Sequence, residues 1–399
     1  MAIPACCKKY GLPLYCASWV PFDKIQQNSI LQQEPKEETT REENSNEIKQ
    51  SPSLIRYLVF GGGGGEGRSG VPNALLLAQF DFSTASLSDE PVNKLRTNEE
   101  LPYRMAVHPG GEGLVCSFTQ DCKWFEWDIP NSDESPKLAL RSSEKLLTQL
   151  ESVGLQLALS FNSEGSILAA GGEDGHLRVF KWPSMDIILD QADAHGSVKD
   201  LDFSSNGKFL VSLGNSGPCR VWDLISSVIV ANLPRENDEI FGFCRFSQSS
   251  VNETLYITAM KGKHGGIISW NTTSWMRAGS KQLVRDPVSA FNISADGKLL
   301  ALGTIEGDVI IVDSATKQVH TRVKKAHLGL VTVLTFSQDA RALVSSSFDS
   351  SARVTVIENK KQNGYSMWLI FFIILLAIIA YITKDTEVLS YICPHMKKG

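Results

Sequence analysis

Five stretches of this chain resemble one another and follow at a spacing of 42 to 45 residues. Each opens with a phenylalanine and then alternates turns that contain Gly or Asp with runs of β-forming residues. The phenylalanines that open them are Phe161, Phe203, Phe246, Phe291 and Phe336. A period of about 40–45 residues with four short strands in each unit is typical of a blade of a β-propeller. The repeat therefore predicts an all-β fold in which the units stand around a ring.

A sixth unit begins at Met105 and lies further from its successor than the other units do. We explain the 56-residue step from Met105 to Phe161 by a polar insert at 131–152, which we expect to be helical. With this insert set aside, the sixth unit has the same order of turns and β-rich runs as the other five. It therefore counts as a further blade.

A seventh unit covers residues 10–81 and has an interruption of its own. After its first β-rich run comes a stretch at 27–50 that is rich in Glu, Gln and Asn, which we expect to be a disordered insert. The β-rich runs of this unit are 12–19, 54–60 and 73–80. Seven units predict a seven-bladed propeller that occupies residues 1–361.

Two of the units end a strand on Trp–Asp, at Trp222 and at Trp127. An Ala–His pair, at His195 and again at His327, stands where a Gly–His pair is usual, and in these details the chain resembles the WD-repeat family. The resemblance implies that a His, a turn Asp and a Trp form a hydrogen-bonded framework inside a blade. We therefore expect a structural role, and neither a catalytic nor a metal-binding one, for His195, Trp222, His327 and Asp349.

The charge balance and the cysteines argue against two classes of function. The formal net charge of −5 gives no basic field of the kind that nucleic-acid-binding proteins use, so we expect no nucleic-acid partner. The eight cysteines form no C-x-x-C pair and have no His at zinc-site spacing. We therefore expect no zinc and interpret the cysteines as free thiols in a reducing compartment.

No apolar run follows the N-terminal lysines, which argues against a secretory signal peptide.

A stretch without any charge lies near the C-terminus. Residues 365–383, YSMWLIFFIILLAIIAYIT, are long enough at about 1.5 Å per residue to cross a hydrocarbon core of ~30 Å as one helix. A buried core helix is the alternative, but such a helix rarely needs to be apolar on every face. Lys360 and Lys361 on the N-terminal side favour a transmembrane helix with a cytosolic propeller, and residues 384–399 would then form a short lumenal tail.

The least ordinary part of the first unit is a glycine-rich segment between two β-rich runs. It reads GGGGGEGRSGVPN from Gly61 to Asn73, so its backbone can take positive φ at many positions and can approach a partner closely. A phosphate-binding P-loop would need a Lys and a following helix, and the segment offers neither. A flexible hairpin without a function is another alternative. Glu66, Arg68 and Pro72, at the tip and exit of the segment, argue against this alternative and favour a loop that contacts a binding partner.

Three motifs of the first unit, YGLPLY from Tyr10, GGGGEG and GVPN, together with a propeller and a C-terminal anchor, are similar to the Sec-twelve family. That family comprises endoplasmic-reticulum membrane proteins that act as guanine-nucleotide exchange factors for the Sar-type small GTPase, which starts the COPII coat. The resemblance is closest to the plant branch. It implies a GTPase-contacting loop organised around a monovalent cation, potassium, with Asn73 among the ligands. The residues of this exchange loop are Gly61, Gly62, Gly63, Gly64, Gly65, Glu66, Gly67, Arg68, Gly70, Val71, Pro72 and Asn73.

The resemblance implies an exchange catalyst that makes no covalent bond. Our hypothesis is that Glu66 disfavours bound phosphate or Mg²⁺ by charge repulsion, although Glu66 could equally be solvated at the loop tip. The main alternative function is a non-catalytic facilitator that helps specific membrane cargo leave the endoplasmic reticulum. In proteins with that function, we expect the glycine-rich loop to be incomplete. A scaffold for ubiquitin or signalling partners is a third function that the sequence neither supports nor excludes.

Overall fold

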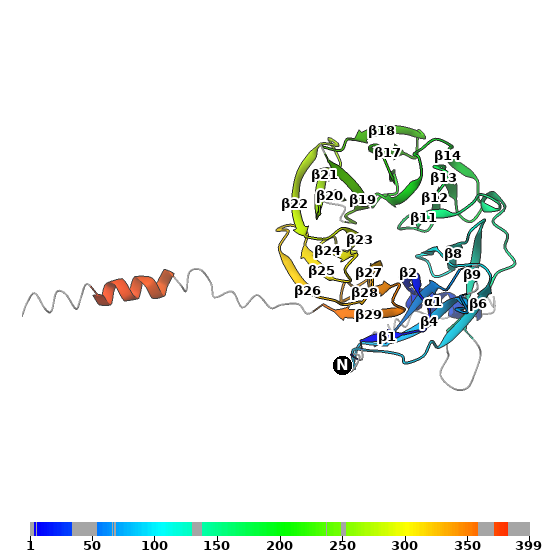
Figure 1. Ribbon diagram of the computed structural model, residues 1–399, viewed down its shortest axis with the longest axis horizontal. Helices are drawn as coiled ribbons and strands as arrows, with labels where there is room; N and C mark the ends of the chain where they lie inside the picture. Colours follow the sequence, from blue (N-terminus) through cyan, green and yellow to red (C-terminus); the bar gives the residue numbers. More distant parts are fainter. Residues whose placement is uncertain are drawn as a thin grey trace, which may run out of the picture. The chain divides into compact units, whose positions relative to one another are not determined.

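The computed structural model describes residues 4, 6–33, 54–65, 67, 69–129, 138–236, 238–248, 253–357 and 371–381. The chain divides into two compact units, Met1–Ile357 and Glu358–Gly399. In the first unit, the described strands form seven sheets that stand around a ring (Figure 1). The predicted seven-bladed β-propeller is confirmed.

Each blade is an antiparallel sheet, and the seven innermost strands line a central channel of about 360 Å³. Blade 1 comprises, from the centre outwards, β2 (Leu14–Trp19), β3 (Ile55–Gly62), β4 (Asn73–Asp81) and then β5 (Ser86–Leu87) and β6 (Asn93–Asn98), which both pair with β4. Blade 2 comprises β7 (Arg104–Val107), β8 (Gly113–Ser117), β9 (Cys122–Asp128) and β10 (Ala139–Ser142). Blade 3 comprises β11 (Gln156–Phe161), β12 (Ile167–Gly172), β13 (Leu177–Lys181) and β14 (Ile187–Gln191).

The remaining four blades follow the same order. Blade 4 comprises β15 (Val198–Phe203), β16 (Phe209–Gly214), β17 (Cys219–Asp223) and β18 (Val228–Leu233). Blade 5 comprises β19 (Glu239–Phe246), β20 (Thr254–Lys261), β21 (His264–Asn271) and β22 (Arg277–Val284). Blade 6 comprises β23 (Val288–Ile293), β24 (Leu299–Thr304), β25 (Val309–Asp313) and β26 (Val319–Val323). Blade 7 comprises β27 (Val331–Phe336), β28 (Ala342–Ser347), β29 (Ser351–Val356) and, outermost, β1 (Cys7–Lys9).

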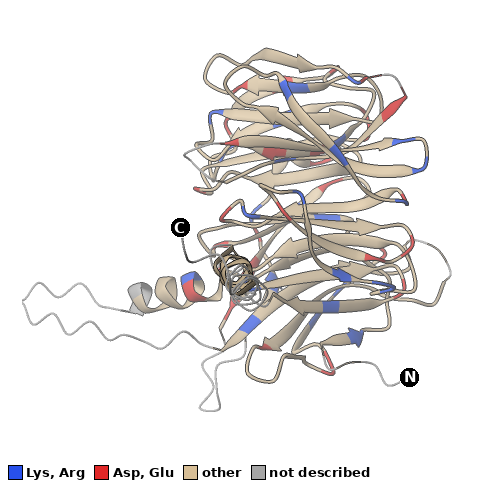
Figure 2. Ribbon diagram, turned by 90° about the vertical axis from the view of Figure 1, so that its left-hand side faces the viewer, with Lys and Arg blue, Asp and Glu red and all other residues tan. Residues whose placement is uncertain are grey.

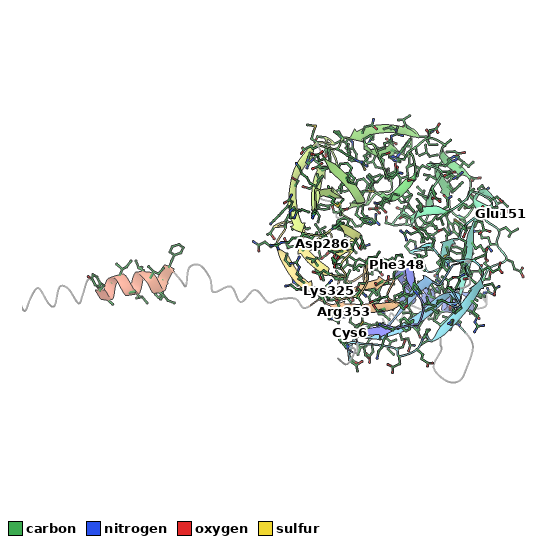
Figure 3. The ribbon with its side chains drawn as sticks, in the orientation of Figure 1. Cys6, Glu151, Asp286, Lys325, Phe348 and Arg353 are labelled. Carbon is green, nitrogen blue, oxygen red and sulfur yellow. The ribbon has the colours of Figure 1, made fainter. Side chains whose placement is uncertain are left out.

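The ring is closed by a strand from the beginning of the chain. Strand β1 pairs antiparallel with β29, with Cys7 opposite Arg353, and the N–H of Val354 also donates to the carbonyl of Cys6 at 2.8 Å. Figure 3 labels Cys6 and Arg353 at these adjoining segments. Blade 7 is thus built from both ends of the propeller, so the first and last units hold each other in place.

Apolar side chains fill the space between neighbouring blades, as strand β4 illustrates. Its even-numbered residues, such as Leu76, pack with Val344 and Val354 of blade 7, whereas Leu75 and its odd-numbered neighbours pack with Leu114 and the rest of blade 2. A strand in the middle of a blade therefore has two buried faces, and its sequence reads as one apolar run instead of an alternating pattern. This explains the continuous ALLLA in β4.

Blade 1 contains a helix where the sequence predicts disorder from residue 27. Residues Phe22–Gln33 form α1, so the prediction is wrong for 27–33, and residues 34–53 lie outside the described part. The helix starts because Phe22 and Ile25 join the core between blades 1 and 2, and because Asp23 in its first turn pairs with Arg56 at 2.8 Å. Composition alone does not reveal these contacts.

The expected helix at 131–152 is also wrong where the structure describes that insert. Residues 139–142 form β10, which pairs with β9 as the outer strand of blade 2. The only helical turn that the described part of the insert contains is the 3-10 turn Thr148–Leu150, anchored by the buried Leu147 and Leu150. Residues 130–137 are outside the described part.

The second unit is described only at 371–381, which is helical. The ends of the expected transmembrane stretch at 365–383 and the expected lumenal tail at 384–399 lie outside the described residues. Within the described residues, no helix has both the length and the hydropathy required to cross a membrane.

Candidate functional site

The glycine-rich loop connects β3 to β4 in blade 1. In an antiparallel blade, the turn between the second and third strands lies at the same end as the connection that enters the first strand. The loop therefore lies on the face of the ring that also carries residues 10–13, which lead into β2, and residues 99–103, which lead into β7. A hydrogen bond of 3.0 Å from Gly63 N–H to the carbonyl of Pro13 ties the loop to the first of these segments.

The glycines at the base of the loop are required because other atoms occupy the place of a side chain. A Cβ at Gly61 would lie 2.6 Å from Cys16 Sγ, and a Cβ at Gly62 would lie 1.9 Å from the carbonyl oxygen of Pro13. The first glycines of the run thus allow β3 to approach β2 and the Pro13 turn at backbone distance.

The glycines nearer the tip have a different reason to be there. Gly65 and Gly70 adopt φ of +78° and +73°, which residues with a Cβ rarely take, whereas Gly67 is surrounded by open space. Gly67, Gly70 and Pro72 are exposed. The structure does not describe Glu66 and Arg68. The backbone of the described tip residues is therefore exposed to solvent, whereas the base of the loop is held in place by close packing.

Asn73 closes the base of the loop. Its side chain is only 2% exposed, its Nδ2 donates to the carbonyls of Gly65 at 3.2 Å and Asn98 at 3.1 Å, and its Oδ1 accepts from Gly65 N–H at 3.0 Å. An amide is the side chain that supplies both a donor and an acceptor at this spacing. Asn73 therefore joins the loop to the end of β6.

Oxygen atoms of three residues lie beside the backbone of Gly63 or Gly64. A Cβ at Gly63 would lie 2.1 Å from Asn73 Oδ1, and a Cβ at Gly64 would lie 2.0 Å from Ser69 Oγ and 2.9 Å from the carbonyl oxygen of Val71. Amide, hydroxyl and carbonyl oxygens are hard ligands of the kind that alkali and alkaline-earth cations take. The base of the loop thus fits a monovalent cation in the kind of atoms that it offers.

The structure brings His195 and Trp222 together through a third residue. His195 Nε2 lies 2.8 Å from Ser212 Oγ, and Trp222 Nε1 donates to the same oxygen at 2.8 Å. Burial, with Arg220 beside the ring, lowers the pKa of His195 to about 4. A neutral His195 that shares the buried hydroxyl of Ser212 with Trp222 suits a framework that holds strands together.

Blade 7 has a second framework around His327. Its ring lies 2.7 Å from Ser345 Oγ and 2.5 Å from Ser351 Oγ, and the carboxylate of Asp349 is 3.9 Å away. Burial lowers the pKa of His327 to about 4, although Asp349 opposes this shift. The sequence motifs indicate the two histidines but not the serines that join them to the strands, because serine occurs at many other positions of the repeats.

Comparison with known proteins places this chain among relatives of the same architecture. The family model described as "WD domain, G-beta repeat" matches residues 151–181, 189–223 and 317–355. The chain is 50% identical over 366 residues to SEC12-like protein 2 of Arabidopsis thaliana, with 92% of this chain and 91% of that protein covered. The chain belongs to the SEC12-like family. SEC12-like protein 1 of the same plant is 31% identical, with 83% of this chain and 84% of that protein covered.

More distant similarities extend beyond the plant members of the SEC12-like family. Guanine nucleotide-exchange factor SEC12 of Rattus norvegicus is 22% identical, with 82% of this chain and 91% of that protein covered. A chain of the solved structure "COPII on membranes, outer coat vertex" superposes with a TM-score of 0.65 at 13% identity, over 90% of this chain and 87% of that one. At this identity the superposition shows a shared fold alone. The family resemblance predicted from the sequence is confirmed.

Proposed function

We propose that this SEC12-like chain is a guanine-nucleotide exchange factor that activates a Sar-type small GTPase at the endoplasmic-reticulum membrane and so starts COPII vesicle budding. The observation that carries the proposal is the loop from Gly61 to Asn73, which is buried and hydrogen-bonded at its base and exposed at its tip. The name of the rat relative, a guanine nucleotide-exchange factor, supports the same activity.

An exchange factor works by differential binding and needs no covalent chemistry. It binds the nucleotide-free GTPase more tightly than the nucleotide-bound form, and thermodynamic linkage then weakens nucleotide binding by the same factor. A loop that is ordered before it binds loses little conformational entropy on insertion. The bonds from Asn73 to Gly65 and from Gly63 to Pro13 provide this order at the base.

Residue Glu66 has a proposed role at the tip, although it lies outside the described residues. A carboxylate that enters a nucleotide site would repel the phosphates or compete for Mg²⁺. Its neighbours Gly65 and Gly67 allow the backbone to bring it close to a partner, because neither position is crowded.

A monovalent cation, potassium, is part of the proposal. When bound, it would supply positive charge that holds loop oxygens together. Asn73 Oδ1, Ser69 Oγ and the carbonyl of Val71 are the atoms of this chain that would hold it. Their role is to fix the turn from Gly63 to Gly65, so that the tip keeps one conformation.

The membrane part of the proposal is based on the uncharged residues 365–383. One helix over this stretch would place the propeller in the cytosol and residues 384–399 in the lumen. A protease added to sealed microsomes should then digest the propeller while a tag after Gly399 stays protected. Digestion of both, or protection of both, would contradict this topology.

The exchange activity is tested with the full chain in liposomes and a Sar-type GTPase loaded with fluorescent GDP. The wild-type chain should accelerate GDP release, and Asn73→Ala should release the base of the loop and remove most of the acceleration. Glu164→Ala is the control, since Glu164 is exposed in the β11–β12 turn at the other end of the ring. No acceleration by the wild-type chain would reject the exchange function and leave the cargo facilitator as the alternative.

A further inference from the structure

Strand β18 forms the outer edge of blade 4, and none of its residues is charged. Its sequence is VIVANL from Val228 to Leu233. In each of the other six blades, an outermost strand carries at least one charged residue: Lys9 in β1, Lys94 in β6, Arg141 in β10, Asp190 in β14, Lys281 in β22 and Arg322 in β26. Charged side chains are also spread over the propeller in the view of Figure 2, so an outer strand without any is an exception.

The backbone of β18 is open along its outer side. The strand pairs with β17, and within the described residues no other strand pairs with it. Figure 1 shows β18 on the rim of the ring. An edge strand of this kind has unpaired N–H and C=O groups that can pair with a strand of another molecule. Proteins commonly protect such an edge with charged side chains, and β18 lacks this protection.

A β-bulge, which can also protect an edge, does not set β18 apart from the other outer strands. The register between β17 and β18 shifts next to Trp222, so Val230 lies opposite no residue of β17. The outer strands β14, β22 and β26 have a shift of the same kind against their neighbours. Those three strands therefore have both a bulge and a charge, whereas β18 has the bulge alone.

Apolar side chains surround the open edge. Val228, Ile229 and Val230 follow one another and are 51%, 39% and 41% exposed. Because side chains alternate along a strand, Val228 and Ile229 expose apolar surface on both faces of the blade. Ile225, in the turn that leads into β18, is exposed as well. The edge thus combines unpaired backbone groups with apolar side chains that water does not solvate well.

We propose that β18 is a docking edge at which two copies of this chain pair in antiparallel orientation, strand against strand. Two identical edges pair well only where like charges do not meet, because like charges opposite each other destabilise a pair of strands. Strand β22 would bring Arg277 and Lys281 towards a second set of the same cations, whereas β18 would bring valine and isoleucine together. Each copy offers what the other needs, so this interface is self-complementary.

The pairing edge is short, and the expected dimer is therefore weak. The strand has six residues, and an interface smaller than about 1,200 Å² is typical of transient complexes. We expect a dissociation constant in the micromolar range. The glycine-rich loop lies in blade 1 and β18 on the rim of blade 4, so the pairing does not use the loop and does not depend on the proposed exchange activity.

The test measures the protein mass of the full-length chain in detergent micelles by sedimentation velocity, from about 1 to about 100 µM. The wild-type mass should rise from monomer towards dimer. Ile229→Lys should keep the wild-type unfolding midpoint and raise the dissociation constant about tenfold or more, because like charges then meet at the edge. Val319→Lys, at an equally exposed position of the outer strand β26, is the matched control and should dimerise as the wild-type chain does.

A mixture of two variants separates pairing at β18 from association through any other part of the chain. Ile229→Lys and Ile229→Glu should each stay monomeric, and an equal mixture should associate, because opposite charges then meet at the edge. Val228→Lys serves if Ile229→Lys does not fold. A wild-type chain that stays monomeric would leave the edge to a different protein and overturn the proposal. The proposal also fails if Ile229→Lys dimerises as strongly as the wild-type chain.

Discussion

Asn73 and Gly65 hydrogen-bond each other twice. Asn73 Nδ2 donates to the carbonyl of Gly65 at 3.2 Å, and Gly65 N–H donates to Asn73 Oδ1 at 3.0 Å. The pair joins the first residue of β4 to a glycine at φ +78°, so these two hydrogen bonds close the base of the loop. The loop conformation therefore depends on a side chain that can donate and accept at once.

The first prediction concerns Asn73→Asp, which keeps the acceptor and loses the donor. A carboxylate there would face the carbonyls of Gly65 and Asn98 without a proton to share, in a position only 2% exposed. We expect the free energy of unfolding to fall by about 1–3 kcal/mol, measured by urea denaturation. Stimulated GDP release should fall about tenfold, because raising the free energy of the active loop conformation by about 1.4 kcal/mol lowers its population by that factor. Wild-type stability in this variant would mean that the Nδ2 bonds do not hold the loop.

A second prediction compares two glycines of the same loop. Gly63→Ala would place a Cβ 2.1 Å from Asn73 Oδ1, whereas Gly67→Ala meets nothing within 4 Å. Gly63→Ala should therefore lower both the unfolding midpoint and the rate of GDP release, whereas Gly67→Ala should leave the unfolding midpoint unchanged. Equal effects of the two substitutions would show that the loop needs flexibility instead of close packing at its base.

The glycine run shows how far the sequence alone reaches into this site. Seven glycines among thirteen residues predict an unusual loop, and the neighbouring motifs identify the family. The run does not tell which glycines are there for space and which for φ, because that depends on Pro13 and Cys16, which reach the loop only in the folded blade. Glycine has no side chain whose type could indicate its neighbours.

A third prediction concerns stability as a function of pH. His327 is 2% exposed, and its pKa is about 4 in the folded chain against about 6.5 when unfolded. Between these values the unfolded state binds the proton and the folded state does not, so stability falls as pH drops from about 6.5 towards 4. His327→Gln removes this contribution. The stability difference between wild-type chain and variant should shrink by up to about 2 kcal/mol from pH 7.5 to pH 5.

A matched histidine tests whether the effect belongs to the buried framework. His264 is exposed on β21, and His264→Gln should leave the pH dependence of urea denaturation as it is in the wild-type chain. If His327→Gln and wild-type chain lose stability in parallel as the pH falls, the framework histidine does not titrate in the predicted range.

The blade count was predictable because each blade repeats the same turns, whereas the ends of the ring were not. Strand β1 is three residues long, CKK, and two of its residues are charged, so it has no pattern typical of a strand. It forms because the edge of β29 offers free backbone groups next to the turn at Tyr10, whose N–H donates to the carbonyl of Ser350 at 3.0 Å. Long-range pairing of this kind leaves no local signal.

The final prediction follows from this closure of the ring. Deletion of residues 1–9 removes the three pairs between β1 and β29 and the buried Cys7, and it exposes the edge of β29. The free energy of unfolding should fall by about 2 kcal/mol or more, from lost hydrogen bonds and lost apolar burial, and light scattering should detect aggregation through the open edge. Deletion of residues 1–3 is the control, since the paired strand remains. If both truncated chains unfold at the same urea concentration as the wild-type chain, blade 7 is stable with three strands. Strand β1 then contributes nothing measurable to the free energy of unfolding.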